Sequence, residues 1–341
     1  MDPANPSSFN HRTELLSTGR RYHFVDQIPD NFDAAATETL LLVHGFPDCW
    51  YGWRHQIGPW TRQGYRVVVP DMLGYGGTDK PKDAEEYTSK KLCADLAALL
   101  DFVGVRQAVV IGHDWGSFVV NRFALWQSDR LKALVLLSIP YIPPAKEYVS
   151  LEATVQQAPD WGYQLYFADQ QFTAEIEGKL ELFLKFMFSQ RRPGAPPTIP
   201  FTKPGQLRKL LMDNSDLDPN RMCFLSKEES AYYVEQLRNM QGPLNYYRTT
   251  RLRFDEEQAA NLPFNLSASL PVLYIGGTRD PTARLELVSR TKPLAPRLQD
   301  EYLEGKGHWI MVEAQIAITE RIPAWLQELG LGSAKGAQTK L

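Results

Sequence analysis

The sequence predicts an α/β fold in which helices cover a mostly parallel sheet and a helical segment interrupts the alternation. Short runs rich in β-branched residues recur along the chain between turn residues, a pattern typical of buried strands. These runs cover residues 39–43, 66–70, 108–111, 131–139, 271–275 and 299–303. Helical patterns lie between them, and strands that alternate with helices form a parallel sheet with helices on its faces.

Two helices in the first half of the chain are predicted from periodicity. Between residues 89 and 103, apolar side chains recur on one face, and Gly104 follows as a stop signal. A shorter apolar helix is predicted over 118–125, directly after the strand at 108–111 and a sharp turn.

The alternation of strands and helices breaks after Pro140. From 141 to about 265 we expect no strands, only helical stretches such as 175–188 and 227–240 around the proline-rich loop RRPGAPPTIPFTKPG. The economical interpretation is a helical domain inserted between two strands. We therefore divide the chain into a first core segment at 1–140, the insertion at 141–265, a second core segment at 266–330 and a C-terminal tail at 331–341.

Composition and charge narrow the function classes. The 37 Lys and Arg nearly cancel the 40 Asp and Glu, without forming a basic stripe, so nucleic acid is not an expected partner. Three scattered cysteines, Cys49, Cys93 and Cys223, fit a reducing compartment better than a disulfide framework or a zinc site. No run reaches the roughly 18 apolar residues of a membrane span, and the N-terminus lacks the apolar region of a secretory signal. We expect a cytoplasmic protein with no membrane span.

The stretch VVIGHDWGSF places Asp114 between Gly112 and Gly116, where a predicted strand turns sharply into a helix. This is the setting of a nucleophile elbow, and Asp114 occupies the nucleophile position. The two glycines suit that interpretation because a tight turn leaves no room for larger side chains. The alternative is that Asp114 only caps the helix, since an Asp that opens a helix often accepts a backbone N–H.

Two further residues favour the catalytic interpretation. Asp280 in GGTRDP follows the strand at 271–275, and His308 in GKGHW follows the last predicted strand. The order Asp114, Asp280, His308 is that of a nucleophile, an acid and a histidine at the carboxyl ends of the strands of such a sheet. Taken singly, His308 could be a hydrogen-bonded loop residue and Asp280 part of an ordinary turn before Pro281.

Five motifs in order resemble the soluble epoxide hydrolases of the α/β-hydrolase fold. They are HGFPDCWYGWRHQ at 44–56, DMLGYGGTDKP at 71–81, GHDWGS at 112–117, GPLNYYR at 242–248 and GHW at 307–309. The resemblance implies an eight-stranded sheet, a lid formed by the insertion at 141–265, and neither a metal nor an organic cofactor. It also assigns an oxyanion hole to the backbone N–H groups of Phe46 and Trp115, and a cis bond between Phe46 and Pro47.

A carboxylate nucleophile at position 114 restricts the bonds that the protein can cleave. On an ester or amide carbonyl, Asp114 would form an anhydride that is more reactive than the starting material, so serine would serve better there. A saturated carbon is the sensible target, because displacement yields an ester on Asp114. Water deprotonated by His308, which Asp280 orients, can then hydrolyse that ester. The substrate is therefore expected to be a small-molecule epoxide or an alkyl halide.

The leaving group separates these two substrates, because an opening epoxide generates an alkoxide that needs an acidic O–H. By resemblance, Tyr163 and Tyr247 are the lid tyrosines that hold the epoxide oxygen, although Tyr166 or Tyr246 could be confused with them. We therefore expect an epoxide hydrolase. A haloalkane dehalogenase is the nearest alternative, and a non-catalytic hydrolase-like binding protein ranks third because no catalytic residue is missing.

The last residues, Thr339-Lys340-Leu341, differ by one residue from the peroxisomal signal Ser-Lys-Leu. An exposed tail after a helix near 325–329 is the alternative that we favour. The sequence leaves open whether the chain forms a homodimer, and which epoxide it prefers.

Overall fold

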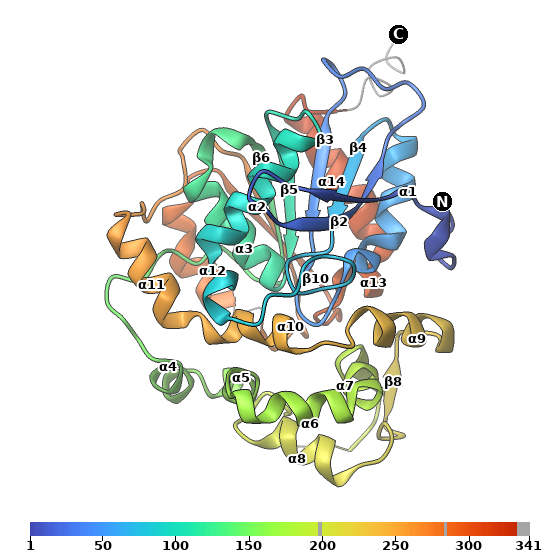
Figure 1. Ribbon diagram of the computed structural model, residues 1–341, viewed down its shortest axis with the longest axis vertical. Helices are drawn as coiled ribbons and strands as arrows, with labels where there is room; N and C mark the ends of the chain where they lie inside the picture. Colours follow the sequence, from blue (N-terminus) through green and yellow to red (C-terminus); the bar gives the residue numbers. More distant parts are fainter. Residues whose placement is uncertain (197–199, 283–284, 333–341) are drawn as a thin grey trace.

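The computed structural model describes residues 1–196, 200–282 and 285–332 of the chain. Within these residues, eight strands form one sheet in the order β1-β2-β4-β3-β5-β6-β9-β10 (Figure 1). The strands are β1 His11–Leu15, β2 Arg21–Gln27, β3 Thr39–Val43, β4 Arg66–Pro70, β5 Ala108–His113, β6 Leu131–Leu137, β9 Val272–Gly277 and β10 Leu298–Leu303. All six predicted strands are confirmed, with ends that differ by at most two residues.

The sheet is parallel from β4 to β10, whereas β2 runs antiparallel to both β1 and β4. Strands β3, β4 and β5 are buried along their whole length, which explains their continuous apolar runs. In contrast, β1 alternates between exposed and half-buried residues at the sheet edge. Strand β1 gave no apolar run because a half-exposed edge strand keeps its charged residues. Strand β2 gave none because polar residues interrupt it, among them Asp26, which is buried in an ion pair with Arg66.

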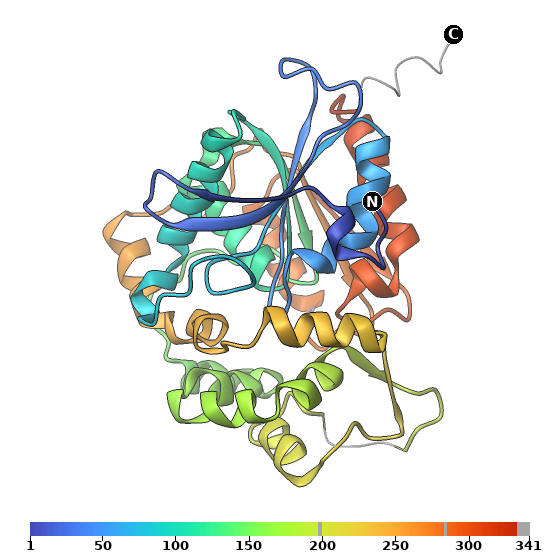
Figure 2. The same cartoon turned by 45° about the vertical axis from the view of Figure 1, so that its right-hand side comes forward.

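Helices cover both faces of this sheet. In Figure 2, α1 Arg54–Arg62 and α14 Gln315–Glu328 pack together on one face, while α2 Ser89–Phe102 and α3 Trp115–Trp126 lie on the other. The remaining helices of the core are α12 Leu285–Thr291 and α13 Ile310–Glu313. Helix α2 confirms the prediction for 89–103, and α3 begins three residues before the predicted 118–125. Within the described residues, no helix is long and apolar enough to cross a membrane.

The segment 141–265, called the lid below, lies across the end of the sheet where β5 stops (Figures 1 and 2). Its helices are α4 Leu151–Gln157, α5 Tyr163–Ala168, α6 Thr173–Gly178, α7 Leu180–Met187, α8 Gln206–Asp213, α9 Lys227–Gln236, α10 Gln241–Asn245 and α11 Thr250–Ala259. The stretch predicted at 175–188 is interrupted at Lys179, where the backbone leaves the helical region. The helix predicted at 227–240 ends at Gln236.

The expectation that the lid contains no strands is wrong. Strands β7 Ser189–Arg191 and β8 Arg221–Cys223 pair antiparallel as a short ribbon. Each strand has only three residues and carries an arginine, so neither forms the apolar run on which the prediction relied. The proposed peroxisomal tripeptide at 339–341 lies outside the described residues.

Candidate active site

The turn from β5 to α3 forces Asp114 into an unusual backbone conformation. Its φ of 53° and ψ of −121° lie where L-residues are rarely found. The close approach of the helix to the sheet explains the flanking glycines. A Cβ on Gly116 would lie 2.2 Å from the carbonyl oxygen of Val43, and one on Gly112 would lie 2.5 Å from the carbonyl oxygen of Gly116. The sequence therefore folds into a strained elbow that presents the Asp114 carboxylate at the end of the sheet.

The Asp114 side chain does not cap the helix it opens, because it makes no capping hydrogen bond. Instead, Oδ1 accepts the backbone N–H of Phe46 at 2.8 Å. The peptide bond between Phe46 and Pro47 is cis, as the family resemblance implies. Burial raises the pKa of Asp114, while the positive charge of His308 and the backbone N–H groups of Phe46 and Trp115 oppose that rise. One carboxylate oxygen is thus bound by Phe46, one of the two residues expected to form an oxyanion hole, and the N–H of the other, Trp115, lowers the pKa of the same carboxyl group.

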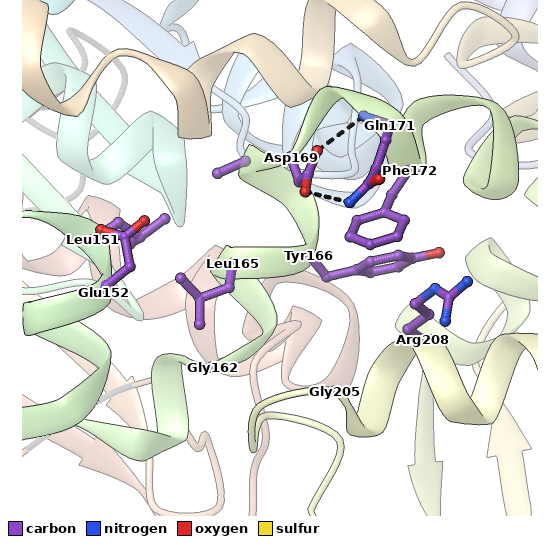
Figure 3. A pocket seen from close by; sticks show the side chains of 11 residues that line it. Leu151, Glu152, Gly162, Leu165, Tyr166, Asp169, Gln171, Phe172, Gly205 and Arg208 are labelled. Atoms are coloured by element: carbon purple, nitrogen blue, oxygen red, sulfur yellow. Dashed lines mark hydrogen bonds between the residues drawn. The ribbon is translucent and has the colours of Figure 1, made fainter.

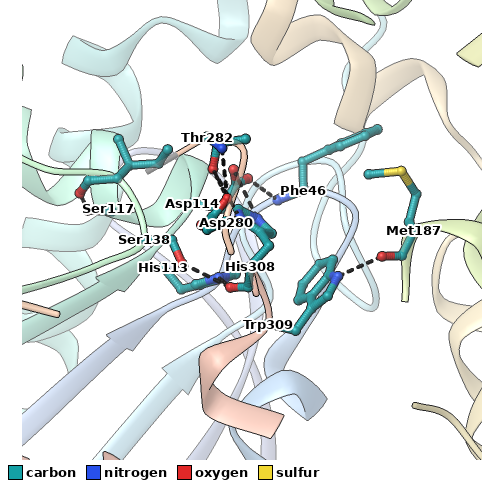
Figure 4. A network of polar contacts seen from close by, with 12 residues as sticks. Phe46, His113, Asp114, Ser117, Ser138, Met187, Asp280, Thr282, His308 and Trp309 are labelled. Atoms are coloured by element: carbon teal, nitrogen blue, oxygen red, sulfur yellow. Dashed lines mark hydrogen bonds and ion pairs between the residues drawn. The ribbon is translucent and has the colours of Figure 1, made fainter. Parts of the chain in front are cut away.

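The structure brings Asp114, Asp280 and His308 together from three distant segments (Figure 4). His308 Nε2 lies 3.5 Å from Asp114 Oδ2, and His308 Nδ1 lies 2.9 Å from Asp280 Oδ2. All three side chains are largely buried, with exposures of 16% for His308, 11% for Asp114 and 0% for Asp280. The imidazole therefore lies between two carboxyl groups, with Nδ1 facing Asp280 and Nε2 facing Asp114.

Two residues that were not predicted from the sequence, Thr282 and Ser138, hold this arrangement in place. Thr282 donates its backbone N–H and its hydroxyl to Asp280 Oδ1, at 2.8 and 2.7 Å. The His308 carbonyl oxygen accepts Ser138 Oγ–H and lies 2.9 Å from His113 Nε2 (Figure 4). Ser138 itself has a φ of 67°, rare for a serine. The Asp-Pro-Thr turn was a readable signal for Thr282, but nothing in the sequence marked Ser138.

The two carboxylates set the charge on His308. Burial lowers the pKa of an imidazole, but here Asp280 and then Asp114 outweigh burial and raise the pKa of His308 to about 9. The pKa of Asp280 shifts in the opposite direction to that of His308. Burial would raise its pKa, yet His308 and the hydrogen bonds from Thr282 bring it below its ordinary value. At neutral pH His308 is therefore mainly protonated in the resting site, beside the ionised carboxylate of Asp280.

Both predicted lid tyrosines line the cavity that contains Asp114. Burial and the nearby Asp114 charge raise the pKa of the Tyr163 hydroxyl, and the same two causes raise that of Tyr247. The two alternative tyrosines point elsewhere. Tyr246 donates its hydroxyl to the Leu73 carbonyl at 3.0 Å. Tyr166, whose hydroxyl donates to Glu175, lines a separate hollow of the lid (Figure 3). Of the four lid tyrosines that were considered, Tyr163 and Tyr247 line the cavity that contains Asp114, and Tyr166 and Tyr246 do not.

The cavity has a volume of about 450 Å³ and is shared between the core and the lid. Its wall is largely apolar, with Phe46, Phe186, Met187, Phe201, Leu210, Phe224 and Trp309 among its lining residues. The size suits a small organic substrate. Among the described residues, no group of three or more His, Cys, Asp or Glu could hold a metal ion.

Comparison with known proteins agrees with this geometry. Residues 38–315 match the family model described as alpha/beta hydrolase fold, so the chain is an α/β hydrolase. The epoxide hydrolase srdG of Neurospora crassa is 30% identical over 96% of this chain and 98% of its own length. Epoxide hydrolase A of Mycobacterium tuberculosis is 32% identical over 86% and 91%. The chain belongs to the epoxide hydrolase family of the α/β-hydrolase fold.

Longer relatives and solved structures fall in the same family. Bifunctional epoxide hydrolase 2 of Mus musculus is 31% identical over 95% of this chain, which spans 57% of the length of the mouse protein. The crystal structure of an epoxide hydrolase from Vigna radiata superposes with a TM-score of 0.77 at 29% identity, over 95% of this chain and 99% of that one. An epoxide hydrolase from an endophytic Streptomyces gives 0.79 at 28%, over 95% and 97%.

Proposed function

We propose that the protein converts epoxides to vicinal diols through a covalent ester on Asp114. The observation that carries the proposal is the composition of one cavity. It holds a carboxylate at a nucleophile elbow, a histidine bound to a second carboxylate, and two lid tyrosines. The named relatives support the same reaction class.

In the first step, Asp114 Oδ2 attacks a carbon of the epoxide ring and the carbon–oxygen bond of the ring breaks. Oδ2 is the attacking atom because Oδ1 already accepts the Phe46 N–H and becomes the carbonyl oxygen of the ester. The alkoxide that forms takes a proton from Tyr163 or Tyr247. Such general-acid help contributes typically 10²–10⁴-fold in rate. The Asp114 charge that raises the pKa of both hydroxyls disappears in this same step, so each tyrosine becomes a better acid as the alkoxide develops.

In the second step, His308 removes a proton from water and the hydroxide attacks Cγ of Asp114. His308 must first lose its own proton. The Asp114 charge helps to raise the pKa of His308 to about 9, and it vanishes when the ester forms. The proton that His308 releases converts the tyrosinate of the first step back to tyrosine, so the protons of the two steps balance.

The tetrahedral intermediate places its negative charge on Oδ1, beside the backbone N–H groups of Phe46 and Trp115. One such donor typically contributes about 10²–10³-fold in rate. Collapse of the intermediate breaks the bond between Cγ and Oδ2, and Oδ2 leaves with the diol. The alkoxide of the product takes the proton from His308. The proton that remains on the Asp114 carboxyl group then passes to His308, which restores the Asp114 carboxylate.

Parallel assays with styrene oxide and 1-bromobutane test this function. We expect diol from styrene oxide, no bromide from 1-bromobutane, and loss of diol formation in Asp114→Ala. Bromide release without diol would instead identify a haloalkane dehalogenase. Absence of both products, with the ligand still bound, would identify a non-catalytic binding protein.

A further inference from the structure

The guanidinium group of Arg253, on the lid helix α11, stacks on two aromatic rings of the elbow helix α3. Its Cζ atom lies 5.2 Å from the ring centroid of Trp115 and 4.7 Å from that of Phe118. A cation within about 6 Å of such a centroid is attracted by the electrons of the ring face, and Trp is the strongest aromatic partner. A charged lid residue therefore contacts the side chain of the residue that directly follows Asp114.

No ion pair compensates the charge of Arg253 within the part of the chain that the structure describes. Burial lowers the pKa of Arg253 to about 10, so the group stays protonated at neutral pH, and the charge of Glu257 opposes this shift. Glu257 itself pairs with Arg122 at 2.6 Å. Arg253 donates from Nε to Thr249 Oγ1 at 3.0 Å and from Nη2 to Thr250 Oγ1 at 3.5 Å. These two bonds orient the guanidinium group and leave its positive charge over the aromatic rings.

The Trp115 ring connects this cation to Tyr247, one of the two proposed proton donors. The ring centroids of Trp115 and Tyr247 lie 5.0 Å apart, with the ring planes at 84°. Burial and then the Asp114 charge raise the pKa of Tyr247, whereas a hydrogen bond from the Trp115 side chain lowers it. The indole N–H is a donor only, so the Tyr247 oxygen accepts that bond. The Trp115 side chain therefore favours the tyrosinate that forms when Tyr247 gives its proton to the alkoxide.

We propose that Arg253 is a positioning residue for the first step, because it holds the Trp115 ring where the indole N–H reaches the Tyr247 hydroxyl. The inference rests on the proposed function, since it assigns a further residue to the same proton transfer. Arg253 acts only through the ring of Trp115. The backbone N–H of Trp115 belongs to the elbow, where α3 begins, so its place in the oxyanion hole does not depend on that ring.

The rate at which styrene oxide alkylates Asp114, followed by mass spectrometry of quenched samples with enzyme in excess, tests the role of Arg253. Arg253→Met keeps a flexible apolar chain against both rings but removes the charge. We expect alkylation to slow by about 3- to 30-fold, the range that corresponds to a cation–π contact withdrawn from water. Arg253→Lys should recover part of the rate, because an ammonium group can also lie over the ring. Hydrolysis of the ester should keep its rate in both variants, because that step uses His308 and backbone N–H groups.

A double-mutant cycle separates positioning from a merely structural role. Tyr247→Phe removes the hydroxyl on which Arg253 acts through Trp115, so Arg253→Met should slow alkylation no further in the Tyr247→Phe background. The same slowing in both backgrounds would overturn the inference, because a structural defect acts whether or not the hydroxyl is present. An unchanged rate of alkylation in Arg253→Met alone would overturn it as well.

Arg251→Met is the matched control. Arg251 also lies on α11 and stacks over an aromatic ring, with its Cζ atom 4.8 Å from the ring centroid of Tyr148. Its side chain is 63% exposed and pairs with Asp255, so its charge is compensated on the surface of the lid. This variant should keep the wild-type rate of alkylation. A loss in Arg251→Met equal to that in Arg253→Met would overturn the inference, because it would mean that any arginine of α11 has the same effect.

Calorimetric binding of 2-phenylacetamide separates this inference from the proposed function. The amide cannot alkylate Asp114, but its carbonyl oxygen can accept the Tyr247 hydroxyl. Weaker binding in Arg253→Met, by about 3- to 30-fold, supports the positioning role even if no epoxide is opened, provided that the difference disappears in the Tyr247→Phe background. If styrene oxide yields diol but Arg253→Met changes neither alkylation nor binding of the amide, the proposed function stands and the inference is wrong.

Discussion

A buried ion pair between Arg122 and Glu257 joins the lid to the core, and its removal should be costly. Arg122 lies on α3, behind the elbow, and Glu257 lies on α11 of the lid. Arg122 Nε is 2.6 Å from Glu257 Oε1, and the two side chains are 4% and 5% exposed. Arg253, one turn earlier on α11, also interacts electrostatically with Glu257. Glu257→Gln would therefore leave two guanidinium groups without their carboxylate.

The expected loss in the free energy of unfolding follows from the burial of the ion pair. Removing one partner of a buried ion pair typically costs about 3–5 kcal/mol, because an uncompensated charge remains. Arg122 also donates to the backbone carbonyls of Ile142 and Pro143, which still stabilise its charge in the variant. We therefore expect the lower end, a decrease of about 3 kcal/mol in the free energy of unfolding.

Urea denaturation of Glu257→Gln, followed by circular dichroism, measures this loss. Asp255→Asn is the matched control, because Asp255 pairs with Arg251 on the same helix with side chains that are 51% and 63% exposed. Exposed pairs of this spacing contribute about 0.3–0.5 kcal/mol. Equal small losses in the two variants would refute the reasoning that the buried pair stabilises the contact between lid and core.

Three further predictions concern the site. Tyr247→Phe should slow alkylation of Asp114 by about 10- to 100-fold in pre-steady-state kinetics. Tyr246→Phe should leave the rate of alkylation unchanged, because the Tyr246 hydroxyl donates to the Leu73 carbonyl. Equal rates in the two variants would mean that Tyr247 is not a proton donor. Gly116→Ala should abolish diol formation, because the new Cβ would lie 2.2 Å from the Val43 carbonyl oxygen, whereas Gly178→Ala meets no atom within 4 Å and should remain active. The raised pKa of His308 stabilises the fold fully below pH 6.5, and this contribution is lost as pH rises through about 9. The free energy of unfolding should fall across that window, with a shallower slope in Asp280→Asn; identical slopes would contradict the assignment.

Much of the fold was predictable because the buried parallel strands are continuous apolar runs. Asp114, Asp280 and His308 were found for a related reason: each follows a strand, and the carboxyl ends of parallel strands meet at one edge of the sheet. The sequence could not separate Tyr247 from its neighbour Tyr246. The direction of each hydroxyl depends on how the lid packs on the core.

Other features depend on contacts between distant segments and left no local signal. Ser138 bonds the His308 carbonyl across 170 residues of chain, and its unusual φ cannot be read from a serine in an apolar run. The β7–β8 ribbon was missed because its three-residue strands carry charge. Its pairing nevertheless sets Arg191 opposite Arg221.

The most direct test of the central claim is a single turnover in H₂¹⁸O with enzyme in excess over styrene oxide. If Asp114 forms the ester and water attacks its Cγ, the ¹⁸O label enters the peptide that contains Asp114, and the first-turnover diol carries none. His308→Gln should then accumulate an adduct whose mass equals enzyme plus epoxide, because ring opening loses no atoms. Label in the first-turnover diol, with none in the Asp114 peptide, would show that water attacks the epoxide directly and would contradict the covalent mechanism.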